Sequence, residues 1–110
     1  MEDEAFAIPP FGIEALLAGD FEQIQVLRDA DLGLLAFVVI HNTRLGPAFG
    51  GIRRWSYGDP GEGLADALRL AEHMTYKCAI HGVPGGGGKV VMLDNPAMDR
   101  RGAYLRLIRC

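Results

Sequence analysis

Two lysines are the residues of this chain whose type and number point most directly to chemistry. Of the 11 basic residues among 110, only Lys77 and Lys89 are lysine, and the other nine are arginine. An arginine side chain stays protonated in proteins, whereas the pKa of a lysine falls when burial disfavours its charged form. A lysine with a lowered pKa serves as a general base or as a proton shuttle near neutral pH. The two lysines, 12 residues apart, are therefore candidates for a reactive site.

Four glycines, Gly85 to Gly88, directly precede Lys89. One interpretation of this run is a flexible surface turn. The other is a segment whose missing side chains leave room for a ligand or for another backbone, and the large entropy cost of ordering four glycines favours it. Lys89 stands between this run and the apolar residues Val90 to Leu93, which predict a short buried strand. We expect this position to withdraw Lys89 partly from water and to lower its pKa.

The glycine run does not match a phosphate-binding loop. A Walker motif requires glycine five residues before its last glycine and serine or threonine after its lysine, but the chain has Val83 and Val90 there. The order of elements is also reversed, because a Walker loop runs from strand to helix and this run leads from helix to strand. No Gly-x-Gly-x-x-Gly fingerprint of a dinucleotide site occurs in the sequence either. Neither motif supports nucleotide binding by these residues.

Lys77 falls in a segment with a clear helical period. Apolar and small residues recur there at spacings of three and four, which predicts a long amphipathic helix. The residues of this face are Leu64, Ala67, Leu68, Ala71, Met74, Thr75 and Cys78. Leu70, Met74 and Lys77 form a stripe along its border. Two interpretations of Lys77 stay open: a surface lysine whose stem lies along apolar neighbours, or a functional cation, which the scarcity of lysine favours.

The remaining pattern predicts strands before and after this helix. We expect a short helix over 12–18, an edge strand over 21–27, a turn over 29–33, a strand buried on both faces over 34–41, a glycine-interrupted strand over 46–55, a loop over 57–63, a strand over 89–93 and a final helix over 98–109. These elements predict a single α/β domain, in which a mostly β, mixed sheet is flanked by helices in a three-layer arrangement.

Composition narrows the class of protein. The net charge of −3 and the isoelectric point near 5.5 argue against a nucleic-acid-binding domain. Residues 1–27 contain six carboxylates and no lysine or arginine, which is the wrong sign for a targeting segment. No apolar run approaches the roughly 20 residues that a membrane span requires. We therefore expect a soluble, cytoplasmic protein that binds neither nucleic acid nor membrane.

Histidine and cysteine do not form a metal-ligand pattern. His41, His73 and His81 are scattered along the chain, and Cys78 lies on the apolar face of the predicted helix. The spacing of Cys78 and His81 suits a ligand pair, but no second pair follows. We expect a core thiol, structural histidines and no bound metal. Two cysteines also make no disulfide framework.

Several linked motifs resemble one enzyme family. They are GPAFGGIR over 46–53, MTYK over 74–77 and GGGK over 86–89. In order and spacing they resemble the amino-acid dehydrogenases that act on glutamate, leucine, phenylalanine and valine. The leucine and phenylalanine branch is the nearer one, because HNT over 41–43, Trp55 and ADALRLA over 65–71 also fit. The resemblance covers roughly residues 20–108.

This resemblance implies an N-terminal substrate-binding and oligomerisation domain of a homo-oligomeric enzyme. A separate Rossmann domain, absent from these residues, would hold NAD. The implied reaction is reversible oxidative deamination of an aliphatic or aromatic L-amino acid to a 2-oxo acid and ammonia. Lys77 would bind the substrate carboxylate, and Lys89 would be the catalytic residue that contacts the reacting amino or carbonyl group and activates water. The remaining substrate-binding residues would be Gly50 and Met74 at the side-chain pocket, and Gly86, Gly87 and Gly88 where substrate approaches the backbone.

Three departures from the family pattern affect these expectations. Phe49 stands where a smaller aliphatic residue is usual, and Gly85 replaces a usual leucine. The chain also stops at Cys110, before the family's catalytic aspartate and cofactor domain, so we expect a truncated and inactive fragment. The alternative is a stand-alone oligomerisation or ligand-binding module that has lost catalysis. The identity of the amino acid, the choice between NAD and NADP, and the number of subunits stay open.

Overall fold

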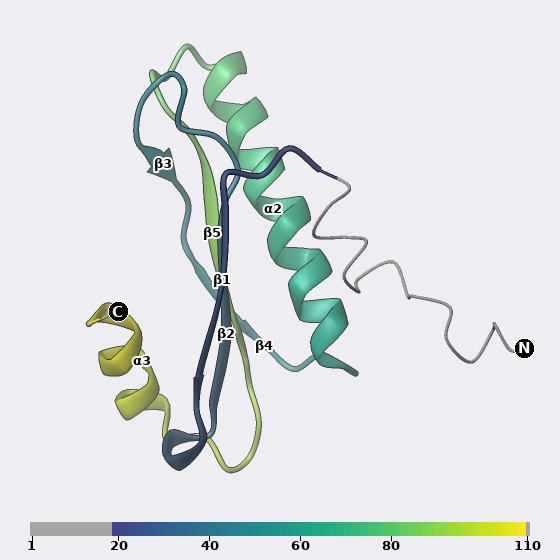
Figure 1. The fold of residues 1–110 in the computed structure, drawn as a ribbon, viewed down its shortest axis with the longest axis vertical. Helices are drawn as coiled ribbons and strands as arrows, with labels where there is room; N and C mark the ends of the chain where they lie inside the picture. The colour runs from purple at the N-terminus through teal and green to yellow at the C-terminus, as the bar shows by residue number, and fades with distance from the viewer. Residues whose placement is uncertain (1–18, 110) are drawn as a thin grey trace, which may run out of the picture.

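The computed structural model describes residues 19–109, which form a five-stranded sheet between two helices. Helix α2 (Pro60–Ile80) lies against one face of the sheet and helix α3 (Arg100–Ile108) against the other, as Figure 1 shows. The predicted α/β architecture with a mixed sheet is therefore confirmed. The short helix predicted over 12–18 lies outside the described residues. Neither described helix is long and apolar enough to cross a membrane.

The strand order explains the burial pattern of the sequence. The strands are β1 (Gln23–Asp29), β2 (Leu34–Ile40), β3 (Ala48–Phe49), β4 (Ile52–Trp55) and β5 (Gly86–Leu93). β1 pairs only with β2, so it is the predicted edge strand, and β2 lies between β1 and β5 with both faces covered along much of its length. The turn predicted after β1 is a single 3-10 turn that ends at Gly33, whose φ of 67° is a conformation glycine adopts readily.

The opposite edge of the sheet is shared by two short strands. β3 and β4 both run parallel to β5 and pair with it in succession, at Gly86 to Gly87 and at Val90 to Leu93. Gly50 and Gly51 separate β3 from β4, which agrees with the predicted interruption of this strand by glycines. Because parallel neighbours need a crossover connection, α2 carries the chain from the end of β4 back to the start of β5.

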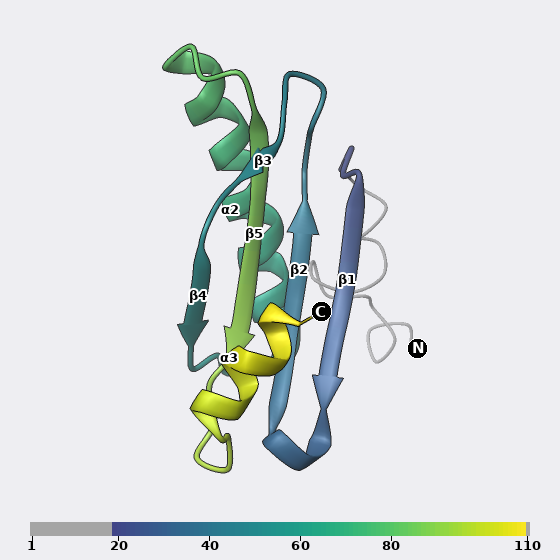
Figure 2. The same cartoon turned by 90° about the vertical axis from the view of Figure 1, so that its left-hand side faces the viewer.

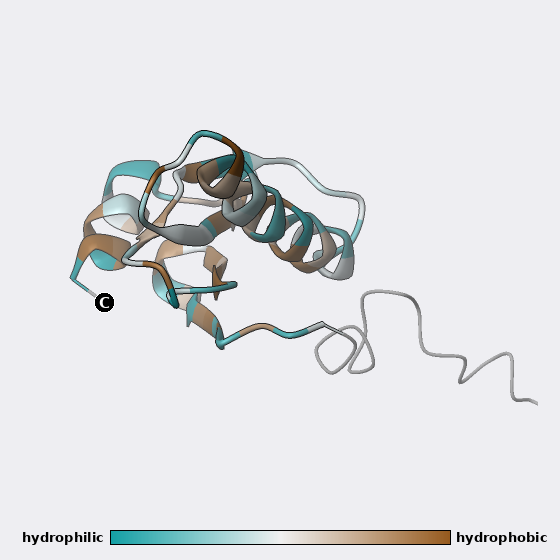
Figure 3. Cartoon of the chain, turned by 90° about the horizontal axis from the view of Figure 1, so that it is seen from above, coloured by the Kyte–Doolittle hydropathy of each residue, from teal (hydrophilic) through white to brown (hydrophobic). Residues whose placement is uncertain are grey.

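Helix α2 begins four residues earlier than the apolar period indicated. The segment expected to be a loop up to Gly63 contains its start: Asp59 is the N-cap, its carboxylate accepts a hydrogen bond from the Gly61 N–H at 3.1 Å, and Pro60 occupies the first turn. Both residues favour turns, but aspartate also caps helices and proline is tolerated at the first helical position. Brown and teal residues alternate along the helix in Figure 3, as an amphipathic helix requires.

Each face of the sheet has its own apolar cluster. The α2 side contains Phe37, Val39, Leu64, Ala67, Leu68, Ala71 and Val91. The α3 side contains Leu34, Ala36, Met92, Met98, Ala103 and Leu107. Helix α3, predicted from Met98, begins at Arg100 because the Asp99 carboxylate accepts a hydrogen bond from the Gly102 N–H at 3.0 Å. It crosses only part of the sheet, and Figure 2 shows the upper part of β2 and β5 uncovered on that side.

The glycine run is part of a strand, so the interpretation as a surface turn is wrong. β5 begins at Gly86, three residues before the predicted start at Lys89, and Gly85 to Gly88 are all buried. A side chain at Gly86 would overlap the carbonyl group of Asn42, and one at Gly87 would overlap the carbonyl oxygen of Ala71 on α2. The missing side chains therefore leave room for other segments of backbone, as the second interpretation allowed.

This packing predicts that Gly87→Ala lowers the free energy of unfolding by about 3 kcal/mol, because the new methyl group has no space between β5 and α2. Urea unfolding followed by circular dichroism measures the change. Gly51→Ala is the matched control, since its Cβ would meet no atom closer than the Lys89 Nζ at 3.8 Å, and we expect a change within about 0.5 kcal/mol. Equal losses in the two variants would contradict this description of the packing.

Candidate functional site

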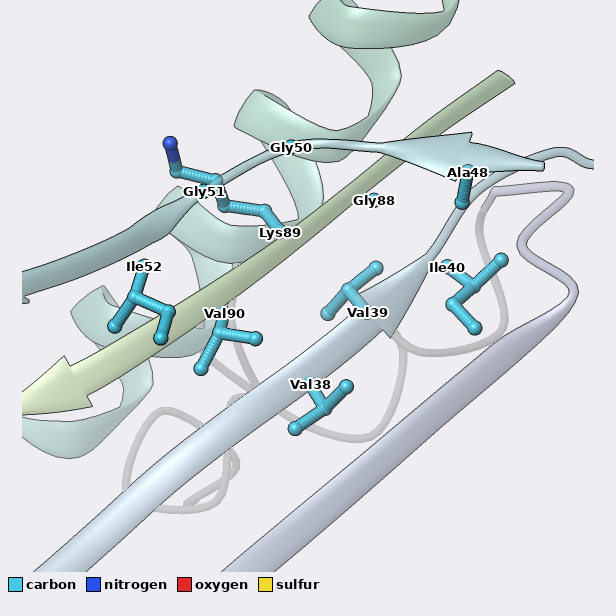
Figure 4. Close-up of a pocket in the computed structure, with 10 residues that line it drawn as sticks. All are labelled: Val38, Val39, Ile40, Ala48, Gly50, Gly51, Ile52, Gly88, Lys89 and Val90. Carbon is cyan, nitrogen blue, oxygen red and sulfur yellow. The ribbon is translucent and has the colours of Figure 1, made fainter. Parts of the chain in front are cut away.

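Lys89 lies on β5 where the sheet meets its β3–β4 edge. Side chains alternate along a strand, so Lys89 shares the α2 side of the sheet with Val91, which belongs to the cluster under α2. Figure 4 shows its side chain directed toward Gly51 and away from Val38 and Val90. The residue is half-buried, so its stem is enclosed while its amino group reaches the edge of the sheet.

The two glycines between β3 and β4 have different reasons to lack a side chain. At Gly50 a side chain would overlap the carbonyl oxygen of Gly88 on the neighbouring strand. At Gly51 the only nearby atom is the Lys89 Nζ, at 3.8 Å from the position of a Cβ. Gly50 therefore permits close backbone packing, and Gly51 leaves open the space beside the lysine amino group.

Helix α2 directs one flank toward the same edge. Asp66, Leu70, Met74 and Lys77 follow one another at spacings of four, four and three, which places them on one side of the helix. Asp66 locates that flank, because its carboxylate oxygen lies 3.2 Å from the Arg53 Nε on β4. Met74 is half-buried and Lys77 is exposed. The flank that faces the β3–β4 edge thus carries the second lysine.

Six arginines make the ion pairs of the described residues. Within residues 19–109, every ion pair to a carboxylate is made by an arginine. The pairs of Arg53 with Asp66 and of Arg54 with Asp94 lie on opposite faces of β4, as the alternation of the strand predicts. Among the described residues neither lysine pairs with a carboxylate, so nothing in this part of the chain prevents either amino group from binding an external anion.

The Asp66 carboxylate is the electrostatic centre of this flank. It accepts a hydrogen bond from the Tyr57 hydroxyl at 2.6 Å and another from Arg69, and it also lies beside Arg53. Burial alone would raise its pKa, but the hydrogen bonds from Tyr57 and Arg69 and the attraction of both arginines outweigh burial and hold the pKa below its ordinary value. Burial, and next the bond to Asp66, raise the pKa of Tyr57.

A shallow hollow of about 260 Å³ lies beside the glycines of this edge, mostly on the face that α3 leaves open. Its lining residues are Val38, Val39, Ile40, Ala48, Gly50, Gly51, Ile52, Gly88, Lys89 and Val90. Figure 4 shows apolar side chains of β2, β4 and β5 lining it while the Lys89 amino group turns away. The hollow is therefore an apolar surface next to Lys89, and Lys77 is not among its lining residues.

The structure brings three of the seven predicted site residues together, since Lys89, Gly50 and Gly88 line one hollow where β5 lies against the β3–β4 junction. Met74 and Lys77 lie on the flank of α2 that also carries Asp66. Gly86 and Gly87 lie deeper, and the backbone of Asn42 and of α2 occupies the space next to them. Their contact with substrate stays a prediction that concerns their backbone atoms alone.

The described residues do not fit a dinucleotide cofactor. Phosphate-binding glycines stand in a loop before a helix, where free N–H groups point at the anion. Here the glycines stand inside β5 and their N–H and carbonyl groups serve the sheet: Gly86 donates to the Pro47 carbonyl at 3.0 Å, and Gly87 accepts from the His41 N–H at 2.7 Å. No three His, Cys, Asp or Glu side chains among residues 19–109 are grouped to hold a metal ion.

Sequence reasoning assigned His41 and Cys78 structural roles, and both are buried. It did not identify their partners. The Nδ1 atom of His41 lies 2.7 Å from the Thr75 hydroxyl, and the Cys78 thiol donates a weak hydrogen bond to the Gly86 carbonyl at 3.6 Å. The position of His41 at the end of the apolar run 34–40 could have indicated a buried imidazole. It could not have identified Thr75 as the partner, because Thr75 is 34 residues away in the chain.

The two unusual residues of the sequence contact each other. A side chain at Gly85 would overlap the ring of Phe49, which occupies that space. Phe49 also lies outside the hollow that its neighbours Ala48 and Gly50 line. The large residue at one position therefore fills the volume left by the small residue at the other.

Comparisons with known proteins identify the family of this chain. Residues 22–110 match the family model described as Glu/Leu/Phe/Val dehydrogenase, dimerisation domain, and the chain belongs to that family. Among curated relatives, the leucine dehydrogenase of Geobacillus stearothermophilus is 48% identical over 87 residues, covering 79% of this chain and 24% of the relative. The phenylalanine dehydrogenase of Bacillus thermotolerans is 47% identical over 81 residues, covering 74% and 21%.

Solved structures give the same family. The L-tryptophan dehydrogenase of Nostoc punctiforme superimposes with a TM-score of 0.76 at 38% identity, over 86% of this chain and 29% of that one. A hetero-hexameric glutamate dehydrogenase of Thermus thermophilus gives a TM-score of 0.58 at 28% identity, over 81% and 22%. The chain thus corresponds to the N-terminal region of such dehydrogenases and spans about a quarter of the curated relatives that it matches. These findings favour the dehydrogenase interpretation over a module that has lost catalysis.

The Asp66 cluster predicts a specific pH dependence of stability. Because the folded-state pKa of Asp66 is below its ordinary value of 3.8, its contribution is fully present above about pH 4 and is lost as the pH falls through the folded-state pKa. We expect Asp66→Asn to lower the free energy of unfolding by about 2 kcal/mol at pH 7. The difference from wild type should shrink below pH 4.

Urea titrations at several pH values measure this difference. Asp20→Asn is the control, because the Asp20–Arg44 pair is exposed, with side chains 89% and 73% accessible, and exposed pairs contribute little. A constant difference for Asp66→Asn down to pH 2 would show that its carboxylate charge does not stabilise the fold.

Proposed function

We propose that this chain is the substrate-binding part of an NAD-dependent dehydrogenase that deaminates an aliphatic or aromatic L-amino acid. The observation that carries the proposal is the pair of lysines at one edge of the sheet, neither of them paired with a carboxylate among the described residues. An L-amino acid has a carboxylate that needs a fixed cation and an amino group that must lose protons. The family membership supports assigning one task to each lysine.

The two environments suit the two tasks. Lys77 is exposed on α2, where its ammonium group binds the substrate carboxylate through a charge-assisted hydrogen bond. Lys89 is half-buried beside Gly51, where it hydrogen-bonds the reacting amino or carbonyl group and transfers a proton to or from water. Met74 and Gly50, which lie near these lysines, border the substrate side chain. A nicotinamide cofactor, bound by residues other than 19–109, would supply the hydride acceptor.

We also propose that the protein works as a homo-oligomer in the cytoplasm. The matched model is named a dimerisation domain, and the Thermus thermophilus relative is titled a hetero-hexamer. Ile52 and Ile108, 45% and 72% exposed, border the part of the sheet that α3 leaves open and supply apolar area for association. The unpaired buried thiol of Cys78 suits a reducing compartment. Sedimentation velocity over a range of concentrations tests association, and a strictly monomeric chain would contradict it.

Because the chain has only two lysines, isotope labelling of lysine reports on the proposed site directly. We expect the side-chain NMR signals of both lysines, assigned with Lys77→Arg and Lys89→Arg, to move on addition of 4-methyl-2-oxopentanoate or L-leucine. Acetate at equal ionic strength is the control for non-specific anion binding. Shifts no larger than those with acetate would remove the lysine pair as a substrate site.

Turnover separates the roles of the two lysines. The assay uses this chain joined to the remaining part of the Geobacillus stearothermophilus leucine dehydrogenase and follows NADH formation from L-amino acids. Lys89→Ala should lower kcat by about 10³-fold, the size of general acid–base catalysis. Lys77→Ala should chiefly raise KM, by about 10- to 100-fold, because a hydrogen bond between charged groups is lost.

Arg101→Ala, a change of an exposed cation on α3, is the matched control and should leave both constants unchanged. A Lys89→Ala variant that retains most of kcat would refute the catalytic role. The chain of 110 residues alone should form no NADH, and accumulation of NADH would overturn that expectation.

A further inference from the structure

His41 occupies an unusual position in the described part of the chain. It directly follows the last residue of β2 and is 8% exposed. Among residues 19–109 it is the only polar or charged residue that is buried. The edge of its ring meets Phe21, with ring centres 5.0 Å apart at 70°. A buried imidazole needs hydrogen-bond partners, because an unpaired polar group in the interior costs free energy.

The partners of His41 lie on the two elements that carry the lysines. Its backbone N–H donates to the Gly87 carbonyl on β5 at 2.7 Å, and its Nδ1 lies 2.7 Å from the Thr75 hydroxyl on α2. Gly87 precedes Lys89 by two residues, and Thr75 precedes Lys77 by two. One residue therefore connects both elements next to the proposed site.

The apolar cluster under α2 fixes the first half of the helix through Leu64, Leu68 and Ala71, but it does not extend to Thr75. At Gly87 no side chain separates α2 from β5, and the missing Cβ would meet the backbone of Ala71 and Thr75. Backbone packed against backbone supplies few interdigitating side chains, which are what give helix packing its specificity. The directional hydrogen bond between His41 and Thr75 adds a constraint on rotation there, beside the weak bond from the Cys78 thiol to the Gly86 carbonyl.

The geometry of the helix shows what this constraint controls. At 100° per residue, Thr75 lies roughly 160° around the axis from Lys77 and roughly 100° from Met74. Thr75 therefore lies on the flank of α2 that faces the end of β2, where it bonds His41. Met74 and Lys77 lie on the flank that faces the β3–β4 edge. A rotation of α2 that breaks the bond to His41 raises or lowers the opposite flank relative to Lys89.

We propose that His41 is a positioning residue, which through Thr75 and Gly87 sets the placement of Lys77 relative to Lys89. It touches neither lysine and acts only through the two elements that bear them. Its importance for catalysis rests on the proposed function, but the placement of the lysines is a property of the folded chain that is measured without ligand.

The test uses the complete chain labelled with ¹³C-lysine, which gives one side-chain signal set for each of its two lysines. Thr75→Val removes the hydroxyl and keeps the shape of the side chain, and we expect both lysine signals to move by more than a linewidth. Thr75→Ser restores the hydroxyl, and both signals should return to their wild-type positions. Thr75→Ala, which also lacks the hydroxyl, gives the same readout should the valine variant not fold.

Asn95→Ala is the matched control for simple destabilisation. It removes two hydrogen bonds, one from the Asn95 side-chain amide to the Gly33 carbonyl and one from the Ala97 N–H to the Asn95 Oδ1, both 2.9 Å long. Asn95 lies beyond the end of β5, six residues from Lys89 in the chain. We expect a lower Tm and unmoved lysine signals. A folded Thr75→Val or Thr75→Ala variant with unmoved lysine signals, or an Asn95→Ala variant that moves them equally, would overturn the proposal.

Addition of 2-oxo acid then separates this inference from the proposed function. Moved lysine signals in Thr75→Val, with no binding by the wild-type chain, would support positioning and refute the substrate site. Binding of the 2-oxo acid by the wild-type chain, together with unmoved lysine signals in Thr75→Val, would support the substrate site and refute positioning by His41. If both proposals hold, the affinity falls about tenfold in Thr75→Val, as expected when one hydrogen-bonded restraint is lost, and recovers in Thr75→Ser.

Discussion

The direct contact between the α2 backbone and Gly87 is the constraint on which the rest of this structure depends. With no side chain between them, helix and strand approach closely enough for Thr75 to reach His41. The same approach places the lysine of the strand and the flank of the helix at a common edge. A glycine there loses more conformational freedom on folding than any other residue, and apolar burial of Val39, Val91 and the leucines of α2 offsets that cost.

Charge is distributed so that this edge stays available. Arginines connect the elements to one another, with Arg53 linking β4 to α2 and Arg54 linking β4 to the loop after β5. A planar guanidinium that stays protonated suits such fixed connections. Within residues 19–109 neither lysine makes such a connection, so both amino groups stay available to an incoming anion.

The periodicity of apolar side chains predicted much of the fold, but it gave no information about the glycine run, which has no side chains. The apolar spacing from Leu64 to Cys78 indicated α2, and the run 34–40 indicated the buried strand. Gly85 to Gly88 carry no pattern, so their place in β5 became visible only with Asn42 and α2 packed against them. Scarcity of lysine and the family motifs identified most of the candidate site, but the bond from His41 to Thr75 spans 34 residues, and neither local sequence nor composition reports such a distance.

The contact between Phe49 and Gly85 couples the choice of residue at these two positions. A side chain at position 85 would overlap both the Phe49 ring and the carbonyl oxygen of Pro47, so a larger residue there needs a smaller residue at position 49 and a shift of the backbone. Replacing Phe49 alone by a smaller residue would instead leave a void beside Gly85 and lose the contacts of the ring. A hybrid protein that changes one of these positions therefore has to change the other as well.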